Sequence, residues 1–596
     1  MSAVSSAPKV DLEADGLERK VGFLGLLWSS ETSLIGSGWL FGALTAVLIA
    51  GPAAILGWVL ATIIIALLAL VHAELGGLFP VTGGTSRFPH YAFGSFAGAT
   101  FGWASYLQAA TVAPIEVLAT IQYMSSFSWG KGWYVAQTTG PGTLSTDGIL
   151  IAVALMVIFV VINLFGIKWF SRINSAITIW KVIIPTMTIL ILIIGHFHSS
   201  NFGSSAGGFF SHAIWNSSEG VFVHASPIKT ILLTLPAGIV FSLLGFEQAV
   251  QLAGEAKNPQ KDVARAVICS LIIGATLYIL IQIAFIGAAD PNLLDKLTLK
   301  GQHGWLAAQS AAGQPSWVQN LNAGPFYTIA SVAGIGWLAS VLRADAIISP
   351  GGTGLTYTTS SSRLSYGFAR NGFVPAIFCR INSRTKVPVA SVLLAAVIGL
   401  IFLLPFPSWA ALVNVVTSAS VLMYAAAPLA LGALRLQKPD LPRPYRLPAA
   451  NVLAPAAFVG ATLVIMFSGW STYTTLLVAI LIGYVLIWLS YKFKANPEQQ
   501  PMDWSSAPWI AGYFIGILVI LYFGAFGSGG IIGGIGFFKN VLDQGGNDDL
   551  TLGGTLAAGA VWSLVIYCWA MHSRLPDKEV DRLVQEVYPT ADAGGH

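Results

Sequence analysis

The chain has 596 residues, of which 55% are hydrophobic and 9% are charged, and its mean hydropathy is +0.72. A soluble domain carries roughly 25% charged residues, so this composition excludes an ordinary soluble domain and predicts an integral membrane protein embedded in the lipid bilayer. The net charge of +4 requires no nucleic-acid partner, and the three cysteines are too far apart in sequence to predict a disulfide framework or a metal site.

Long apolar stretches fill most of the chain. A membrane-spanning helix needs about 20 mostly apolar residues, and about 14 stretches reach that length, so we expect an all-α membrane protein with about 14 transmembrane helices. In chain order the stretches are 22–50, 52–77, 96–127, 148–166, 175–195, 228–253, 263–289, 336–368, 387–404, 408–434, 452–470, 472–491, 509–526 and 552–572. The eighth is too long for one regular span, and its Ser349-Pro350-Gly351-Gly352-Thr353-Gly354 sequence is expected to break the helix.

Lysine and arginine fall mainly on one side of these stretches. With a cytoplasmic N-terminus, most of the 30 Lys and Arg residues lie in cytoplasmic segments, while Lys181 and Arg343 lie inside the membrane. The outside loops then hold Lys131, Lys229, Lys296, Lys300 and Lys539. Cytoplasmic loops carry the positive excess, so this pattern predicts a multi-pass protein of the cell membrane with both tails, 1–21 and 573–596, in the cytoplasm. We expect no signal peptide.

Two glycine-centred sequences interrupt apolar stretches. The first stretch is broken at Ile35-Gly36-Ser37-Gly38, and the sixth is broken at 241–246. Backbone that leaves the helix inside a membrane survives only where it lines a cavity and meets a polar ligand. Paired breaks in two halves of a chain therefore point to a transporter's binding site. Helix packing through small residues is the alternative interpretation.

The two breaks offer complementary groups to a small zwitterion. The free N–H groups of the first break, at the positive end of a half-helix, favour a carboxylate. The carbonyls of the sixth stretch favour an ammonium group, and a phenylalanine there would close the pocket. We therefore predict substrate contacts at Ile35, Gly36, Ser37, Gly38, Phe241, Ser242, Gly245 and Phe246.

Several ionisable residues lie within apolar stretches, where charge is costly and usually functional. Lys181 must face a cavity or give up its proton, unless it belongs to a fixed ion pair. Glu116 and Glu247 are able to relay a proton or to accept hydrogen bonds from broken backbone. Three further residues have both a structural and a functional interpretation. Arg343 either extends its charged end toward the membrane surface or contacts a substrate carboxylate. Glu31 and His72 are either polar groups satisfied by packing within the protein or groups that titrate during function.

Several motifs resemble those of the amino acid–polyamine–organocation transporters. They are Ala73-Glu74-Leu75-Gly76 with Phe79-Pro80 and Gly83-Gly84, Gly245-Phe246-Glu247 with Gly254-Glu255-Ala256-Lys257-Asn258-Pro259, and Ala369-Arg370-Asn371-Gly372 with Thr385-Lys386-Val387-Pro388. Within this superfamily the pattern most resembles the bacterial aspartate–proton symporters. The features shared with them are Gly36-Ser37 with Trp39-Leu40-Phe41, the 345–354 stretch, and Leu404-Pro405-Phe406-Pro407-Ser408-Trp409.

The resemblance implies a fold, domain boundaries and residue roles. It implies an inverted five-plus-five helix repeat with broken first and sixth helices: 22–195 as the first repeat, 228–434 as the second, and 452–572 as four peripheral helices. In proton-coupled relatives a lysine matching Lys181 takes the place of a sodium ion beside the first and eighth spans. The resemblance implies proton coupling by Lys181 and Asp345. Glu116 and Glu247 complete the predicted proton-coupling residues because their carboxylates lie in apolar stretches. Because the tenth span borders the pocket in the family, Asn414 and Ser418, one turn apart, join the substrate-binding residues.

Together these features predict a secondary active transporter rather than an enzyme. We expect proton-coupled amino acid symport by alternating access, with the proton as coupling ion and no other cofactor or metal. The resemblance implies an acidic substrate, and a neutral amino acid fits the residues nearly as well. An ion-independent amino acid exchanger is the main alternative, and a nutrient receptor and a membrane-embedded enzyme are further ones. The sequence leaves the oligomeric state open.

Overall fold

The computed structural model of the protein describes residues 19–81, 83–135, 143–165, 167–216, 221–309, 315–385, 387–403, 409–527, 549–585 and 587. Some predicted features lie outside these residues. They are residues 1–18, 586 and 588–596 of the two tails, the predicted outside cation Lys539, Lys386, and the 404–408 part of the motif that ends at Trp409.

The described chain consists mainly of helices. Those in its first half are α1 Phe23–Leu34, α2 Ser37–Ala50, α3 Ala54–Leu78, α4 Gly84–Phe93, α5 Ser95–Met124, α6 Thr146–Leu164, α7 Ile167–Gly195, α8 Pro227–Thr234, α9 Val240–Ser242, α10 Gln248–Gln251 and α11 Pro259–Gly287. They are followed by α12 Pro291–Asp295, α13 Ser316–Ala323, α14 Pro325–Val332, α15 Gly336–Arg370, α16 Val389–Leu403, α17 Trp409–Gln437, α18 Ala450–Phe467, α19 Gly469–Lys492, α20 Pro508–Phe523, α22 Leu552–His572 and α23 Asp577–Gln585.

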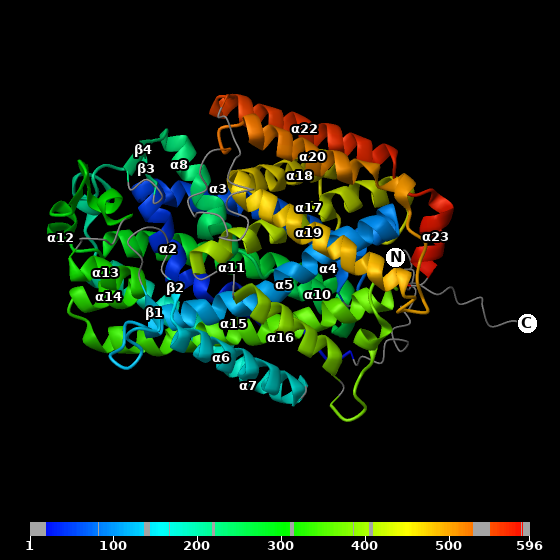
Figure 1. Ribbon diagram of the computed structural model, residues 1–596, viewed down its shortest axis with the longest axis horizontal. Helices are drawn as coiled ribbons and strands as arrows, with labels where there is room; N and C mark the ends of the chain where they lie inside the picture. The colour runs from blue at the N-terminus through cyan, green and yellow to red at the C-terminus, as the bar shows by residue number, and fades with distance from the viewer. Residues whose placement is uncertain are drawn as a thin grey trace, which may run out of the picture.

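Short antiparallel hairpins gather at one end of the helix bundle. They are β1 Tyr134–Val135 with β2 Thr143–Leu144, β3 Ala213–Asn216 with β4 Val221–His224, and β5 Thr298–Leu299 with β6 Gln302–His303. Figure 1 shows β3, β4 and α12 to α14 at this end, which we call the hairpin end, and α23 at the opposite end, which we call the terminal end.

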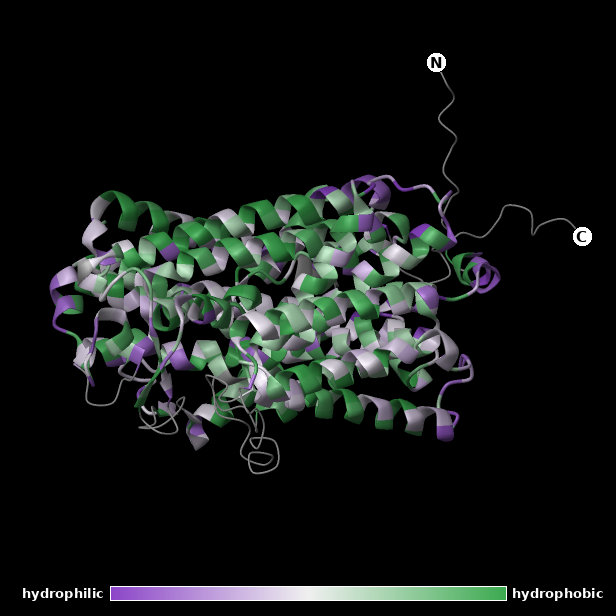
Figure 2. Cartoon of the chain, turned by 90° about the horizontal axis from the view of Figure 1, so that it is seen from above, coloured by the Kyte–Doolittle hydropathy of each residue, from purple (hydrophilic) through white to green (hydrophobic). Residues whose placement is uncertain are grey.

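The long helices carry the apolar surface that a bilayer requires. Within the described ranges, nine helical segments are long and apolar enough to cross a membrane, and three shorter apolar helices accompany them. Hydrophobic residues cover the length of the bundle, and hydrophilic residues gather toward its ends (Figure 2). The all-helical membrane class predicted from the sequence is confirmed, whereas the total of about 14 spans stays a prediction.

Helices α5 and α15 form the centre of the bundle. They pack against each other, and α5 also packs against α4 and α17. The apolar part of α5 is wholly buried. Its many Ala, Gly, Ser and Thr residues explain this, because small side chains let helix backbones approach closely in membranes. The two helices therefore form a rigid wall behind the site described below.

The break predicted at 349–354 is wrong, because α15 runs without interruption from Gly336 to Arg370. Pro350 lies inside this helix and removes one backbone donor. The turns around it hold side chains that bond to main-chain oxygens, among them Thr353 Oγ1 to the Ser349 carbonyl at 3.4 Å and Thr356 Oγ1 to the Gly352 carbonyl at 3.0 Å. Such bonds and close neighbouring helices let a membrane helix tolerate proline.

Two other apolar stretches do leave the helical path. Helix α1 ends at Leu34 and α2 begins at Ser37, with Gly36 between them at φ −116° and ψ −143°. In the sixth stretch, α8 gives way to a π-helical turn, Leu235–Ile239, in which Gly238 has φ +156°. The short helices α9 and α10 follow, separated by turns around Gly245 at φ +129°.

Candidate functional site

A small cavity lies where these two irregular segments meet α5 and α15. Its lining combines residues of α1, α2, α5, α9 and α15 and of the turns between them: Ser33, Leu34, Gly36, Gly38, Val112, Glu116, Phe241, Leu244, Thr353 and Tyr357. Of the predicted substrate contacts, Gly36, Gly38 and Phe241 line it.

Gly36 allows a close approach of two helices beside the cavity. A Cβ atom built on it would lie 2.7 Å from Thr353 Oγ1 and 2.8 Å from Glu116 Oε1. Glycine is therefore the residue that lets α5 and α15 place polar atoms directly against the first break. Gly38 is similarly close to the sixth stretch, because its Cβ would lie 2.5 Å from Ser242 Oγ.

Glu116 reaches the first break from α5. Its Oε2 accepts the Ser37 backbone N–H at 2.8 Å, and its Oε1 accepts the Ser37 hydroxyl at 3.0 Å. The Ser37 N–H is one of the donors that the sequence assigned to a substrate carboxylate. In this structure it is bonded to a carboxylate of the protein itself, which is the arrangement expected for an anion site at a helix N-terminus.

Lys181 reaches the same break from α7. Its Nζ donates to the Thr32 carbonyl at 2.6 Å and to Thr353 Oγ1 at 2.6 Å, so it joins α1 to α15. The side chain is fully buried, and both partners are neutral oxygens. Thr32 also bonds to Thr178 of α7, which adds a second link between the same elements.

Glu247 holds the sixth stretch in its irregular path. Its carboxylate accepts the Gly245 N–H at 2.8 Å, the Tyr357 hydroxyl at 2.9 Å and the Tyr424 hydroxyl. Gly245 is obligatory here, because its φ is positive and a Cβ would meet the Leu34 backbone nitrogen at 2.7 Å. Tyr357 lines the cavity, so one hydroxyl links the cavity wall to this buried carboxylate.

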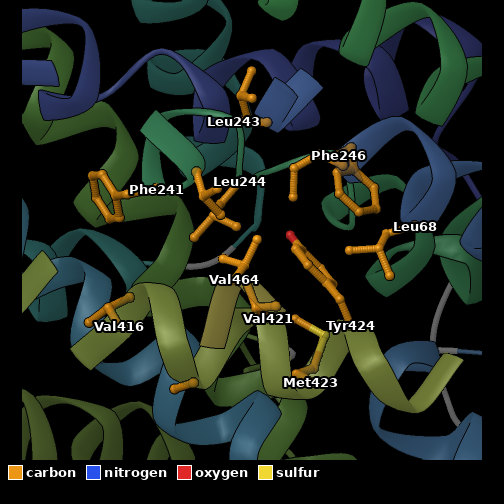
Figure 3. Close-up of a cluster of buried hydrophobic side chains, with 14 of the residues drawn as sticks. Leu68, Phe241, Leu243, Leu244, Phe246, Val416, Val421, Met423, Tyr424 and Val464 are labelled. Atoms are coloured by element: carbon orange, nitrogen blue, oxygen red, sulfur yellow. The ribbon is translucent and has the colours of Figure 1, made fainter. Parts of the chain in front are cut away.

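Phe241 and Phe246 point in different directions, as Figure 3 shows. Phe241 lines the cavity, whereas Phe246 stacks on Tyr424 with ring centroids 4.8 Å apart. His72 packs edge-on against both Phe246 and Tyr424, at 5.5 and 5.3 Å. Its Nδ1 bonds to the Leu68 carbonyl at 2.7 Å. His72 therefore lies beside the Glu247 cluster and away from the cavity lining.

Asp345 and Arg343 both lie on α15 but contact different residues. Asp345 Oδ1 accepts the Trp180 indole N–H and the Ser349 hydroxyl, both at 2.7 Å. The Arg343 guanidinium lies 4.0 Å from the Tyr327 ring centroid and donates to the Ser126 carbonyl at 3.2 Å. Neither residue is among those that line the cavity.

The remaining predicted residues make hydrogen bonds to residues nearby in the chain, or none among the described residues. Asn414 and Ser418 lie on α17, where the Ser418 hydroxyl bonds to the Asn414 carbonyl at 3.0 Å. Ser242 bonds to the Gly238 carbonyl at 2.8 Å, and the N–H of Ile35 bonds to the Glu31 carbonyl at 2.9 Å. The Glu31 carboxylate is fully buried without a hydrogen-bond partner among the described residues. The substrate and proton roles of these residues stay predictions.

Sequence reasoning missed several residues around the cavity: Ser33, Leu34, Val112, Leu244, Thr353 and Tyr357. A signal was present for two of them. Residues 353–362 read Thr-Gly-Leu-Thr-Tyr-Thr-Thr-Ser-Ser-Ser, which is unusually polar for a buried membrane helix and indicates a face turned toward polar partners. Within the described ranges, no group of three or more His, Cys, Asp or Glu side chains is placed to hold a metal ion.

Comparison with known proteins agrees with this architecture. Residues 21–488 match the family model described as amino acid permease. The chain is 36% identical to the glutamate/serine transporter AimA of Bacillus subtilis over 557 residues, which cover 94% of each protein. It is 33% identical to the aspartate-proton symporter of the same organism over 567 residues, which cover 95% of this chain and 98% of the relative.

A more distant relative is named for a different class of substrate. The branched-chain amino acid permease BcaP of Bacillus subtilis is 24% identical over 496 residues, which cover 81% of this chain and 95% of the relative. All three relatives are named as transporters or permeases and none as an enzyme. The chain therefore belongs to the amino acid permease family of membrane transporters, as the resemblance to the amino acid–polyamine–organocation superfamily predicted.

Proposed function

We propose that this protein is a proton-coupled symporter that takes up a small amino acid by alternating access. The observation that carries the proposal is that two ionisable side chains reach the first break, Glu116 from α5 and Lys181 from α7. Glu116 bonds to Ser37, and Lys181 bonds to Thr32. A proton on either group changes how the break is held, which gives proton and substrate a shared structural element.

Glu116 contributes to the coupling by linking proton binding to substrate binding. A substrate carboxylate needs the Ser37 N–H that Glu116 now accepts, and two carboxylates cannot share it without repulsion. Protonation of Glu116 removes its negative charge and weakens its hold on this donor. Substrate binding and proton binding therefore support each other at this position.

Lys181 contributes to the coupling by holding α1 and α15 together. As an ammonium it has three donors, of which two are matched here by the Thr32 carbonyl and the Thr353 hydroxyl. The charged form therefore fastens α1 to α15 more strongly than the neutral amine does. We assign to this contact the closure of the loaded transporter and its release when the proton leaves.

The substrate class follows from the cavity and the relatives. Glu116 is the charged residue among those that line the cavity, so once it is protonated the lining is uncharged and accepts a neutral amino acid as well as an acidic one. Relatives named for glutamate and serine and for aspartate span the same two classes. We propose uptake of small acidic and neutral amino acids.

The charge pattern orients the protein. We place the hairpin end outside the cell and the terminal end, with α23, in the cytoplasm, because the predicted outside loops form the hairpin end. We also propose that 22–195 and 228–434 are the two inverted repeats and that 452–572 forms the peripheral helices.

Transport by the purified protein in liposomes tests the proposal. Radiolabelled serine, aspartate and glutamate are offered with and without a pH gradient that is acidic outside. Accumulation that depends on the gradient supports symport. Counterflow that persists while gradient-driven uptake is absent selects the exchanger instead.

Lys181→Ala separates coupling from transport. We expect this variant to lose the pH dependence of uptake while counterflow remains measurable, because Lys181 is not among the residues that line the cavity. Lys257→Ala, at an exposed position in the loop before α11, is the matched control and keeps both activities. Unchanged pH-driven uptake by Lys181→Ala rejects the assignment of Lys181.

A further inference from the structure

Trp409, the first residue of α17, touches both irregular segments at once. Its indole N–H donates to Ser37 Oγ at 2.8 Å. Its ring lies 5.3 Å from that of Phe41 on α2 and 6.0 Å, edge to face, from that of Phe241. The side chain is buried, with 2% of its surface exposed. One residue of α17 is thus packed and bonded against α2 and against the sixth stretch.

Trp409 covers the cavity on the side of the hairpin end. Helix α2 runs from the cavity toward that end, where the Ala50 carbonyl accepts the Ser211 N–H from the loop before β3. The Phe41 ring that packs on Trp409 also lies 5.8 Å, edge to face, from the ring of Tyr123 on α5. Trp409 therefore belongs to a group of aromatic rings on this side of the cavity.

The indole also belongs to a hydrogen-bonded chain that ends in the cavity. Ser37 Oγ accepts from Trp409 and donates to Glu116 Oε1. A hydroxyl that donates to a carboxylate becomes a better acceptor, so the Glu116 contact strengthens the Trp409 contact. Separating α17 from α2 breaks the outer bond and leaves the Ser37 hydroxyl with a single partner.

We propose that Trp409 is the positioning residue of the outer gate. It holds the hairpin end closed through its hydrogen bond to Ser37 while the Glu116 carboxylate accepts the Ser37 hydroxyl. Displacement of Glu116 from Ser37 weakens the indole contact and lets α17 move away. This inference rests on the proposed function, since it assigns to the hairpin end the entry of substrate from outside. It adds a gating role for a residue that does not line the cavity.

Access to the cavity from outside tests the gate directly. Val112 lines the cavity, so a Val112→Cys chain is treated in intact cells with a membrane-impermeant thiol reagent, and the chain without that substitution gives the background from the native cysteines. Adding Trp409→Phe keeps the ring and removes the N–H donor. A net hydrogen bond of about 1 kcal/mol predicts a rise of about fivefold in the labelling rate of the introduced thiol.

The control is Trp103→Phe, which also removes a buried indole bond. The Trp103 N–H donates to the Ala479 carbonyl at 2.9 Å, between α5 and α19 and away from the gate. We expect its labelling rate to equal that of Val112→Cys alone. Ser37→Ala removes the Trp409 contact from the opposite side and raises labelling as well, which keeps the proposal testable if Trp409→Phe does not fold.

The two proposals fail in different ways. Equal labelling in Trp409→Phe, Ser37→Ala and Trp103→Phe overturns the gate, whatever the transport assay gives. Faster labelling without any proton-driven uptake keeps the gate and overturns symport. A KM for external substrate that changes in Trp409→Phe more than kcat does further supports a role in access, since a general loss of stability lowers the amount of active protein and leaves KM unchanged.

Discussion

Gly36 lies where α5 and α15 come closest to the first break. The Thr353 hydroxyl and the Glu116 carboxylate, which a Cβ on Gly36 would meet, are both held by other hydrogen bonds and have little freedom to move. Gly36→Ala is therefore expected to lower the uptake rate about tenfold or more, because overpacking a rigid site costs about 1–3 kcal/mol. The measurement is initial uptake in liposomes containing equal amounts of folded protein.

Gly351→Ala is the matched control for this substitution. Gly351 lies on α15 near the same cavity, and a Cβ built on it meets no atom within 4 Å. Alanine is also the better helix former by about 1 kcal/mol. We expect uptake within about twofold of the unmodified protein and equal or higher thermal stability. Equal uptake by the two variants would show that the close approach at Gly36 is unimportant.

Individual residues also show how much of the site could be predicted from the sequence alone. Gly36, Gly38 and Phe241 were predictable, because glycines that interrupt an apolar stretch are a local signal. Val112 and Leu244 were not, since an apolar residue facing a cavity and one facing lipid look alike in sequence. Trp409 was visible only as part of a shared motif, and its contacts depend on how α17 is rotated against α2.

The same contrast appears among the helices. Composition and hydropathy predicted the membrane helices themselves, since a helix that crosses the bilayer needs about 20 mostly apolar residues. They overestimated the effect of Pro350, because a membrane helix tolerates a proline where neighbouring helices pack closely around it, and the sequence does not show that packing. They located the sixth break near 241–246 but missed that the helical path already changes in Leu235–Ile239, where Pro236 and Gly238 occur together.

Helix α4 offers a prediction that concerns stability outside the spans. It packs against α23, and His90 within it is 5% exposed. Burial lowers the pKa of His90 to about 4, and the nearby cations Arg87 and Arg582 add to this effect. An unfolded histidine titrates near 6.5, so the unfolded state binds more protons between those values. Stability therefore falls as the pH is lowered from about 6.5 to about 4, by up to about 3 kcal/mol.

Thermal unfolding in detergent between pH 7.5 and pH 4.5 measures this effect. We expect His90→Gln to flatten the decline of Tm with acidity, because glutamine has no proton to gain. His303→Gln, at an exposed position of β6, should retain the full decline. The assignment is contradicted if His90→Gln loses stability with acidity as steeply as the unmodified protein does.

Over the whole molecule, the two ends of the bundle are held by different chemistry. At the terminal end, Glu74 is fully buried and bonded to Arg435 and Arg443, and Glu255 pairs with Arg363 at 2.8 Å. Toward the hairpin end, the contacts around the cavity are the aromatic ones that begin at Trp409. Under the proposed alternating access, we infer that the ionic contacts on one side and the aromatic contacts on the other open separately.

The charge moved in each transport cycle gives the last prediction. If one proton accompanies each substrate, an acidic amino acid crosses with no net charge and a neutral amino acid crosses with one positive charge. A membrane potential of 100 mV contributes about 2.3 kcal/mol per charge, which corresponds to a change of about fiftyfold in the accumulation ratio. With a potassium diffusion potential, negative inside, we expect serine accumulation to rise strongly and aspartate accumulation to stay nearly constant. A rise for aspartate would indicate more than one proton per cycle, and a fall would indicate none.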